Sequence, residues 1–136
     1  MRTSSLWGKP PTRYYKFIRR VEGEFPSVPL RVAILGCSDG KFVLPAARQG
    51  HYVLAMDIDE IALFGGTKLG PTGAVHMLGL RERLRAEHLS HLVSIVHGDF
   101  VEYRSKKRFH AVFTSGAVQY SRNAPRPIGD RYWLLR

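Results

Sequence analysis

The residues best placed to do chemistry are a glycine-bearing turn and one acidic residue that follows it along the chain. The turn is Gly36-Cys37-Ser38-Asp39-Gly40, and the acidic residue is Asp57, which closes the next apolar run. Glycines let a backbone approach a ligand closely, and a carboxylate can accept hydrogen bonds from both hydroxyl groups of a ribose. The pair therefore predicts a site for a nucleotide-like ligand.

Three short elements must position this pair. Arg31–Leu35 is an apolar run rich in branched residues, which is typical of a buried strand. Lys41–Gln49 has helical spacing and is stopped by Gly50, and His51–Met56 is a second apolar run. This order predicts an α/β fold: a Rossmann-like, doubly wound and mainly parallel sheet with flanking helices.

This stretch resembles the class I S-adenosylmethionine-dependent methyltransferases. In that family the first strand and loop run acidic-x-Gly-x-Gly-x-Gly, and an acidic residue ends the second strand and binds the ribose. Here the loop aligns as Ile34-Leu35-Gly36-Cys37-Ser38-Asp39-Gly40, and Asp57 matches the ribose position. Ser38 replaces the middle glycine, and Ile34 replaces the leading acidic residue. The resemblance implies S-adenosyl-L-methionine as cofactor and S-adenosyl-L-homocysteine as product.

Two later stretches extend the resemblance. Leu92–His97 predicts a third strand, followed by Gly98-Asp99-Phe100, and Phe109–Thr114 predicts a fourth strand. In the family, an acidic residue after the third strand binds the adenine, an apolar neighbour packs on its ring, and the loop after the fourth strand lies near the methionine. The cofactor-binding residues implied by the resemblance are Gly36, Cys37, Ser38, Gly40, Asp57, Ile58, Asp99, Phe100, Thr114 and Ser115.

Three tyrosines are candidate substrate-binding residues. Thr12 is predicted to cap a helix that continues to about Val21, ahead of the first strand. Tyr14 and Tyr15 lie on this helix, and they either reach the site or dock the helix on the sheet. Tyr120 follows the fourth strand, where the family places groups that face the substrate.

No residue is assigned a catalytic role. A sulfonium methyl donor needs an aligned acceptor and exclusion of water more than it needs a general base. The family usually carries an Asp on the fourth strand where this chain has His110. No metal is predicted, because His76, His88 and His91 lack the spacing and the carboxylates of a metal site, and Cys37 is the only cysteine.

The regions around the core are expected to be less regular. Gly65–Gly73 contains four glycines and a proline, which cannot sustain a helix, so it is expected to be a loop, either a lid or a surface excursion. Ala74–His91 is predicted to be an amphipathic helix, with charged residues such as Arg83 on its solvated surface. Met1–Pro11 is expected to be an extended or mobile lead-in.

The chain is divided into three parts by its composition. They are an N-terminal basic segment and helix (1–29), the S-adenosylmethionine-binding α/β core (30–121) and a basic, apolar C-terminal tail (122–136). The family fold has seven strands, so an incomplete version is expected: a truncated protein, a compact variant or one half of an assembly. The apolar Tyr132-Trp133-Leu134-Leu135 must be covered by its own sheet or by another chain, in a homo-oligomer or with a partner.

The net charge of +10 is concentrated at the two ends. Residues 1–31 carry seven basic and two acidic residues, and residues 101–136 carry eight and two, whereas residues 32–100 carry six and seven. The basic ends are either solvated surface or a binding surface for an anionic partner such as a nucleic acid. The sequence contains no apolar stretch typical of a membrane span or a signal peptide, so a soluble, cytoplasmic protein is expected.

Together these observations predict an S-adenosylmethionine-dependent methyltransferase whose acceptor, a small molecule or a nucleic acid, is not identified. Two other interpretations stay open. The chain could bind the cofactor as a non-catalytic or partner subunit, or it could be an NAD-binding Rossmann protein. The second is less favoured, because the turn has the wrong glycine spacing for a dinucleotide and Gly98-Asp99-Phe100 has no role there.

Overall fold

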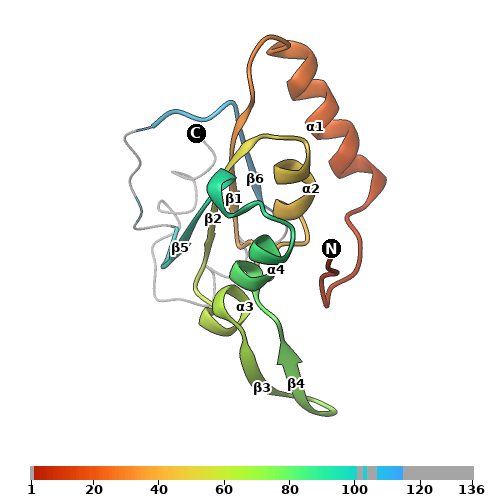
Figure 1. The fold of residues 1–136 in the computed structure, drawn as a ribbon, viewed down its shortest axis with the longest axis vertical. Helices are drawn as coiled ribbons and strands as arrows, with labels where there is room; N and C mark the ends of the chain where they lie inside the picture. The colour runs from red at the N-terminus through yellow and green to blue at the C-terminus, as the bar shows by residue number, and fades with distance from the viewer. Residues whose placement is uncertain (1, 101–102, 104–106, 115–136) are drawn as a thin grey trace, which may run out of the picture.

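A computed structural model describes residues 2–100, 103 and 107–114 of the 136-residue chain (Figure 1). Four strands in this part form a parallel sheet in the order β5-β2-β1-β6. Their bounds are β1 Arg31–Leu35, β2 Tyr52–Asp57, β5 Val93–His97 and β6 Ala111–Thr114. The sheet confirms the predicted Rossmann-like α/β fold class, and each strand lies close to its predicted position.

The helices pack on one face of this sheet. Val32 of β1 is in register with Val53 of β2 and Ala111 of β6, so these side chains point to the same side. The same side carries a buried cluster to which the helices contribute Tyr14, Leu44 and others. The helices are α1 Thr12–Glu24, α2 Val43–Arg48, α3 Glu60–Phe64 and α4 Leu80–Ala86, with a 3-10 turn at Ser90–Leu92.

Helix α1 is docked through one apolar face, as its periodicity predicts. Tyr14, Ile18 and Val21 are buried, and the Tyr14 hydroxyl donates a 2.6 Å hydrogen bond to the Phe42 carbonyl. Burial raises the pKa of the Tyr14 hydroxyl. The predicted cap at Thr12 is wrong. Pro11 is the N-cap and no side chain caps the helix, because Thr12 is already its first helical residue.

The segment predicted as a loop and the start of a helix is instead a β-hairpin. Strands β3 Gly66–Gly70 and β4 Gly73–Met77 pair antiparallel and project from the body of the molecule (Figure 1). Helix α4 begins only after Gly79. A Cβ on Gly79 would lie 2.4 Å from the Gly65 amide nitrogen, so the lack of a side chain at Gly79 allows the two ends of the hairpin to approach closely.

The amino-terminal edge of the sheet is held by two histidines. The Leu30 amide donates to His51 Nδ1 at 3.0 Å, and the Arg31 amide donates to His110 Nδ1 at 2.8 Å. His51 immediately precedes β2, and His110 immediately precedes β6. Each imidazole therefore joins the start of β1 to a neighbouring strand. His110, where the family usually has an Asp, makes a structural contact here.

Tyr14→Phe should destabilise the fold by about 0.5–1.5 kcal/mol, because it removes a buried hydrogen bond to a carbonyl without removing the packed ring. Urea unfolding followed by circular dichroism measures this change. Tyr15→Phe is the matched control, since Tyr15 is 40% exposed and should change the free energy of unfolding little. Equal effects of the two variants would contradict the docking role of Tyr14.

Candidate functional site

The glycine-bearing turn lies at the carboxyl end of β1 and bends sharply. Gly36, Ser38 and Gly40 all have positive φ angles, of 71°, 49° and 98°. Glycine adopts this conformation freely, whereas serine seldom does. Ser38 thus adopts a backbone conformation that favours glycine, and it adds a hydroxyl group.

Asp57 lies beside this turn, as the sequence predicts. Its Oδ2 accepts a 2.7 Å hydrogen bond from the Ser38 amide, and its Oδ1 accepts a 2.8 Å bond from the Asp59 amide. A carboxylate oxygen has capacity for a further hydrogen bond, so Asp57 can still accept ribose hydroxyls. The amides of Gly36 and Cys37 donate to the Met56 carbonyl, which holds the turn against β2.

Two predicted residues next to these have contrasting environments. The Cys37 side chain is 1% exposed, and burial, with the nearby Asp57 carboxylate, raises the pKa of its thiol. Cys37 therefore belongs to the core, and it offers a ligand only its backbone. Ile58 is 65% exposed directly after Asp57, so its side chain is available to pack on a ligand.

Asp59, which the sequence analysis did not select, organises the segment after β2. Its Oδ1 caps helix α3 by accepting from the Ile61 and Ala62 amides, and its Oδ2 accepts from Lys68 Nζ at 2.8 Å. Burial opposes ionisation of this carboxyl group, but the hydrogen bonds from Lys68 and the backbone outweigh it and lower its pKa. Both carboxylate oxygens of Asp59 are thus engaged in local structure.

The remaining predicted cofactor residues lie at the same edge of the sheet where they are described. Asp99 and Phe100 follow β5, which pairs with β2 so that Asp57 is opposite His97. Thr114 ends β6 opposite Leu35 of β1. The Thr114 Oγ1 is buried and has no hydrogen-bond partner among the residues described. Ser115 and the substrate candidate Tyr120 lie outside the described residues.

The other two substrate candidates, Tyr14 and Tyr15 of α1, differ in their surroundings. Both line a groove between α1 and α2, but Tyr14 is buried and its hydroxyl is bonded to the Phe42 carbonyl, whereas Tyr15 is 40% exposed. The geometry of Tyr14 is that of a docking residue. A substrate role for Tyr15 stays a prediction.

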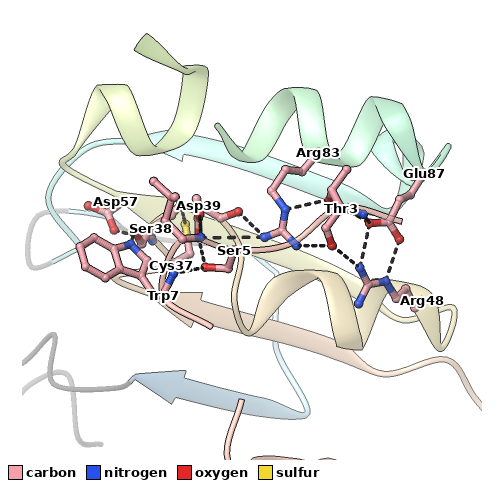
Figure 2. A network of polar contacts seen from close by, with 11 residues as sticks. Thr3, Ser5, Trp7, Cys37, Ser38, Asp39, Arg48, Asp57, Arg83 and Glu87 are labelled. Atoms are coloured by element: carbon pink, nitrogen blue, oxygen red, sulfur yellow. Dashed lines mark hydrogen bonds and ion pairs between the residues drawn. The ribbon is translucent and has the colours of Figure 1, made fainter. Parts of the chain in front are cut away.

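The N-terminal residues, expected to be an extended or mobile lead-in, lie against the turn. We call residues 3–7 the strap (Figure 2). Asp39, 3% exposed, accepts hydrogen bonds from the Ser5 hydroxyl and, at 2.8 Å, from the Leu6 amide. Trp7 Nε1 donates to Ser38 Oγ at 2.9 Å. The strap thus contacts both residues at the centre of the turn.

Two arginines anchor the other end of the strap. Arg83 Nε donates to Thr3 Oγ1 at 2.8 Å, and Arg48 donates to both oxygens of Glu87 at 2.7 and 2.8 Å. Glu87 Oε2 also accepts from the Thr3 amide and hydroxyl, each at 3.0 Å. Thr3 therefore lies between α2 and the end of α4, as Figure 2 shows.

Arg83 was predicted to be solvated and is instead 3% exposed. Burial lowers the pKa of its guanidinium, and the Asp39 charge opposes that shift. Arg83 and Glu87 follow Leu80 by three and seven residues, which is the spacing of the apolar face of α4. This spacing from Leu80 was the one sequence signal that could have shown that both side chains face the core.

The described residues contain no group of three or more His, Cys, Asp or Glu side chains able to hold a metal ion. In the same part of the chain, no helix has the length and apolar character needed to span a membrane.

Solved structures share this fold, whereas no protein-family model and no curated protein matches the sequence. The glycopeptide N-methyltransferase MtfA with sinefungin has a TM-score of 0.60 at 20% identity, over 88% of this chain and 40% of that one. A methyltransferase from Geobacter sulfurreducens with S-adenosyl-L-homocysteine gives 0.61 at 16%, over 92% and 43%. The CcbJ methyltransferase from Streptomyces caelestis gives 0.59 at 22%, over 85% and 40%.

The fold is therefore that of the S-adenosylmethionine-dependent methyltransferases, which confirms the resemblance at the level of fold. This chain spans less than half the length of each of these three structures. The likeness covers 85–92% of this chain.

Low pH should weaken the hydrogen bonds that Glu87 makes with Arg48 and Thr3. The hydrogen bond from Arg48, supported by Thr3 and opposed by burial, lowers the pKa of Glu87 from 4.5 to about 2. The resulting stability is present in full above about pH 4.5 and is lost as the pH falls towards 2. Wild type should thus exceed Glu87→Gln in free energy of unfolding by about 1.5–3 kcal/mol at pH 6, and by less at pH 3.

Urea unfolding at the two pH values measures this difference. Glu82→Gln is the control, because Glu82 is a more exposed carboxylate on the same helix that pairs with Arg85. A difference between wild type and Glu87→Gln that stayed constant from pH 6 to pH 3 would contradict the assignment.

Proposed function

We propose that this chain binds S-adenosyl-L-methionine at the turn and Asp57 and transfers its methyl group to an acceptor. The observation that carries the proposal is the contact between the Ser38 amide and the Asp57 carboxylate at the carboxyl edge of a methyltransferase-like sheet. A carboxylate fixed at this edge, next to a glycine-bearing turn, is suited to a ribose.

The residues present fit this cofactor. Asp57 retains acceptor capacity for the ribose hydroxyls, and Ile58 offers an exposed apolar side chain beside it. The Thr114 hydroxyl, which has no hydrogen-bond partner in the described part of the chain, lies at the end of β6, where a buried polar group needs a partner. When bound, the sulfonium supplies the reactive methyl group. This chain's part is to orient the cofactor and exclude water.

The acceptor is proposed only as a class: a small molecule or a nucleic acid, preferably anionic. The exposed face of α1 supports this preference with Arg13, Lys16 and Arg20, which recur at helical spacing. The C-terminal apolar segment, where an oligomer or a partner chain was expected, lies outside the described residues. Methylation of the acceptor would distinguish an enzyme from a binding subunit.

Calorimetric titration of the purified chain with S-adenosyl-L-methionine and S-adenosyl-L-homocysteine tests the cofactor directly. Saturable binding of both, with none for NADH, is the expected result. NADH binding without binding of either methionine derivative would replace this proposal with the dinucleotide interpretation. Transfer of radiolabelled methyl groups to RNA, DNA and a panel of small molecules then tests turnover.

Asp57→Ala should weaken binding of both methionine derivatives by about 1.5–3 kcal/mol, because it removes charge-assisted hydrogen bonds to the ribose. Asp59→Asn is the matched control. It keeps the capping oxygen of α3 and loses only the ion pair with Lys68, so affinity should stay near that of wild type. Unchanged affinity in folded Asp57→Ala would show that the ribose is bound elsewhere.

A further inference from the structure

Arg83 connects helix α4 to two segments that are distant in sequence. Its Nη1 donates to the Asp39 carbonyl at 2.8 Å, its Nε to Thr3 Oγ1 at 2.8 Å and its Nη2 to the Thr3 carbonyl at 3.2 Å. The Asp39 carboxylate lies 4.0 Å from Nη1. A buried guanidinium is tolerated only when it is paired in this way. One side chain therefore binds both the strap and the turn.

The turn is held on its inner side as well. A Cβ on Gly40 would lie 2.6 Å from side-chain atoms of Leu44 and Leu80 and 3.4 Å from Arg83 Nη1. Helices α2 and α4 thus pack directly against the turn, and Arg83 fills the space next to Gly40. Movement of this guanidinium would change the surroundings of the turn at both Asp39 and Gly40.

The strap completes the support from the solvent side. Ser5 and Leu6 occupy the two carboxylate oxygens of Asp39, and the Trp7 indole is bonded to Ser38, whose own amide binds Asp57. Arg83 binds Thr3 and the Asp39 carbonyl, and the backbone links Asp39 to Ser38, whose amide binds Asp57. The Trp7 side chain stays available, because the residue is 56% exposed.

We propose that Arg83 is a positioning residue of the cofactor site: through Thr3 and Asp39 it fixes the strap and the Ser38–Asp39 turn in their binding conformation. This inference rests on the proposed function, since the ligand of the turn is taken to be S-adenosyl-L-methionine. Arg83 itself does not touch the ligand. The strap becomes part of the site, with Trp7 on its outer side.

Arg83→Lys tests the proposal, because a lysine keeps the charge but cannot donate to Thr3 and Asp39 in the fork geometry of a guanidinium. Arg85→Lys is the matched control on the same helix. Arg85 is largely exposed and pairs with Glu82. Thr3→Val provides a second variant that removes the strap's hydroxyl without changing α4, so the test does not depend on Arg83→Lys folding.

The first readout needs no ligand. In a Trp133→Phe background, Trp7 is the only tryptophan. Its fluorescence quenching by acrylamide should increase in Arg83→Lys and Thr3→Val, and the Ser38 amide should exchange faster with solvent. In Arg85→Lys, the quenching of Trp7 and the exchange of the Ser38 amide should be the same as in the Trp133→Phe protein alone.

The second readout is the affinity for S-adenosyl-L-homocysteine in variants shown to be folded. Arg83→Lys should bind about tenfold more weakly, as expected when the binding conformation of the turn is populated about one tenth of the time, and Arg85→Lys should bind as wild type. A folded Arg83→Lys with unchanged affinity, quenching and Ser38 exchange would overturn the proposal. If wild type binds no S-adenosyl-L-homocysteine, the proposed function fails, while Trp7 quenching and Ser38 exchange still show whether Arg83 positions the turn.

Discussion

The hydrogen bond from the Ser38 amide to the Asp57 carboxylate is the contact on which the site depends. It joins the ends of two neighbouring parallel strands, and it can form only because the backbone turns left-handed at Gly36, Ser38 and Gly40. The same bend directs Asp39 inward, where its carboxylate meets the strap. The left-handed backbone of the turn thus explains both the contact with Asp57 and the burial of Asp39.

The parallel sheet and the core of the site could be predicted because their signals are local. Buried strands of a parallel sheet are short apolar runs, and β1 and β2 are such runs, separated by the turn and α2. Asp57 was identifiable for the same reason, as the polar residue that ends a strand. The likeness to solved methyltransferases then confirmed the fold that these signals indicated.

The hairpin and the strap were not predicted, for two different physical reasons. Met77 belongs to β4, yet its spacing from Leu80 and Leu84 continues the helical pattern of α4, so periodicity alone merged a strand with a helix. The strap is held by polar contacts between residues that lie 31 to 84 positions apart, as between Trp7 and Ser38 or Thr3 and Glu87. Such contacts produce no periodic sequence pattern within the strap.

The two histidines at the opposite edge of the sheet do more than close it. Each imidazole takes the place that a carbonyl would have in the next rung of the β-ladder, and His110 also donates its own amide to the Arg31 carbonyl. A shift of β2 or β6 by one residue along β1 would move an imidazole away from the backbone amide that donates a hydrogen bond to it. That amide would then be unpaired. The histidine that precedes β2 and the histidine that precedes β6 thus favour the observed register of each strand with β1.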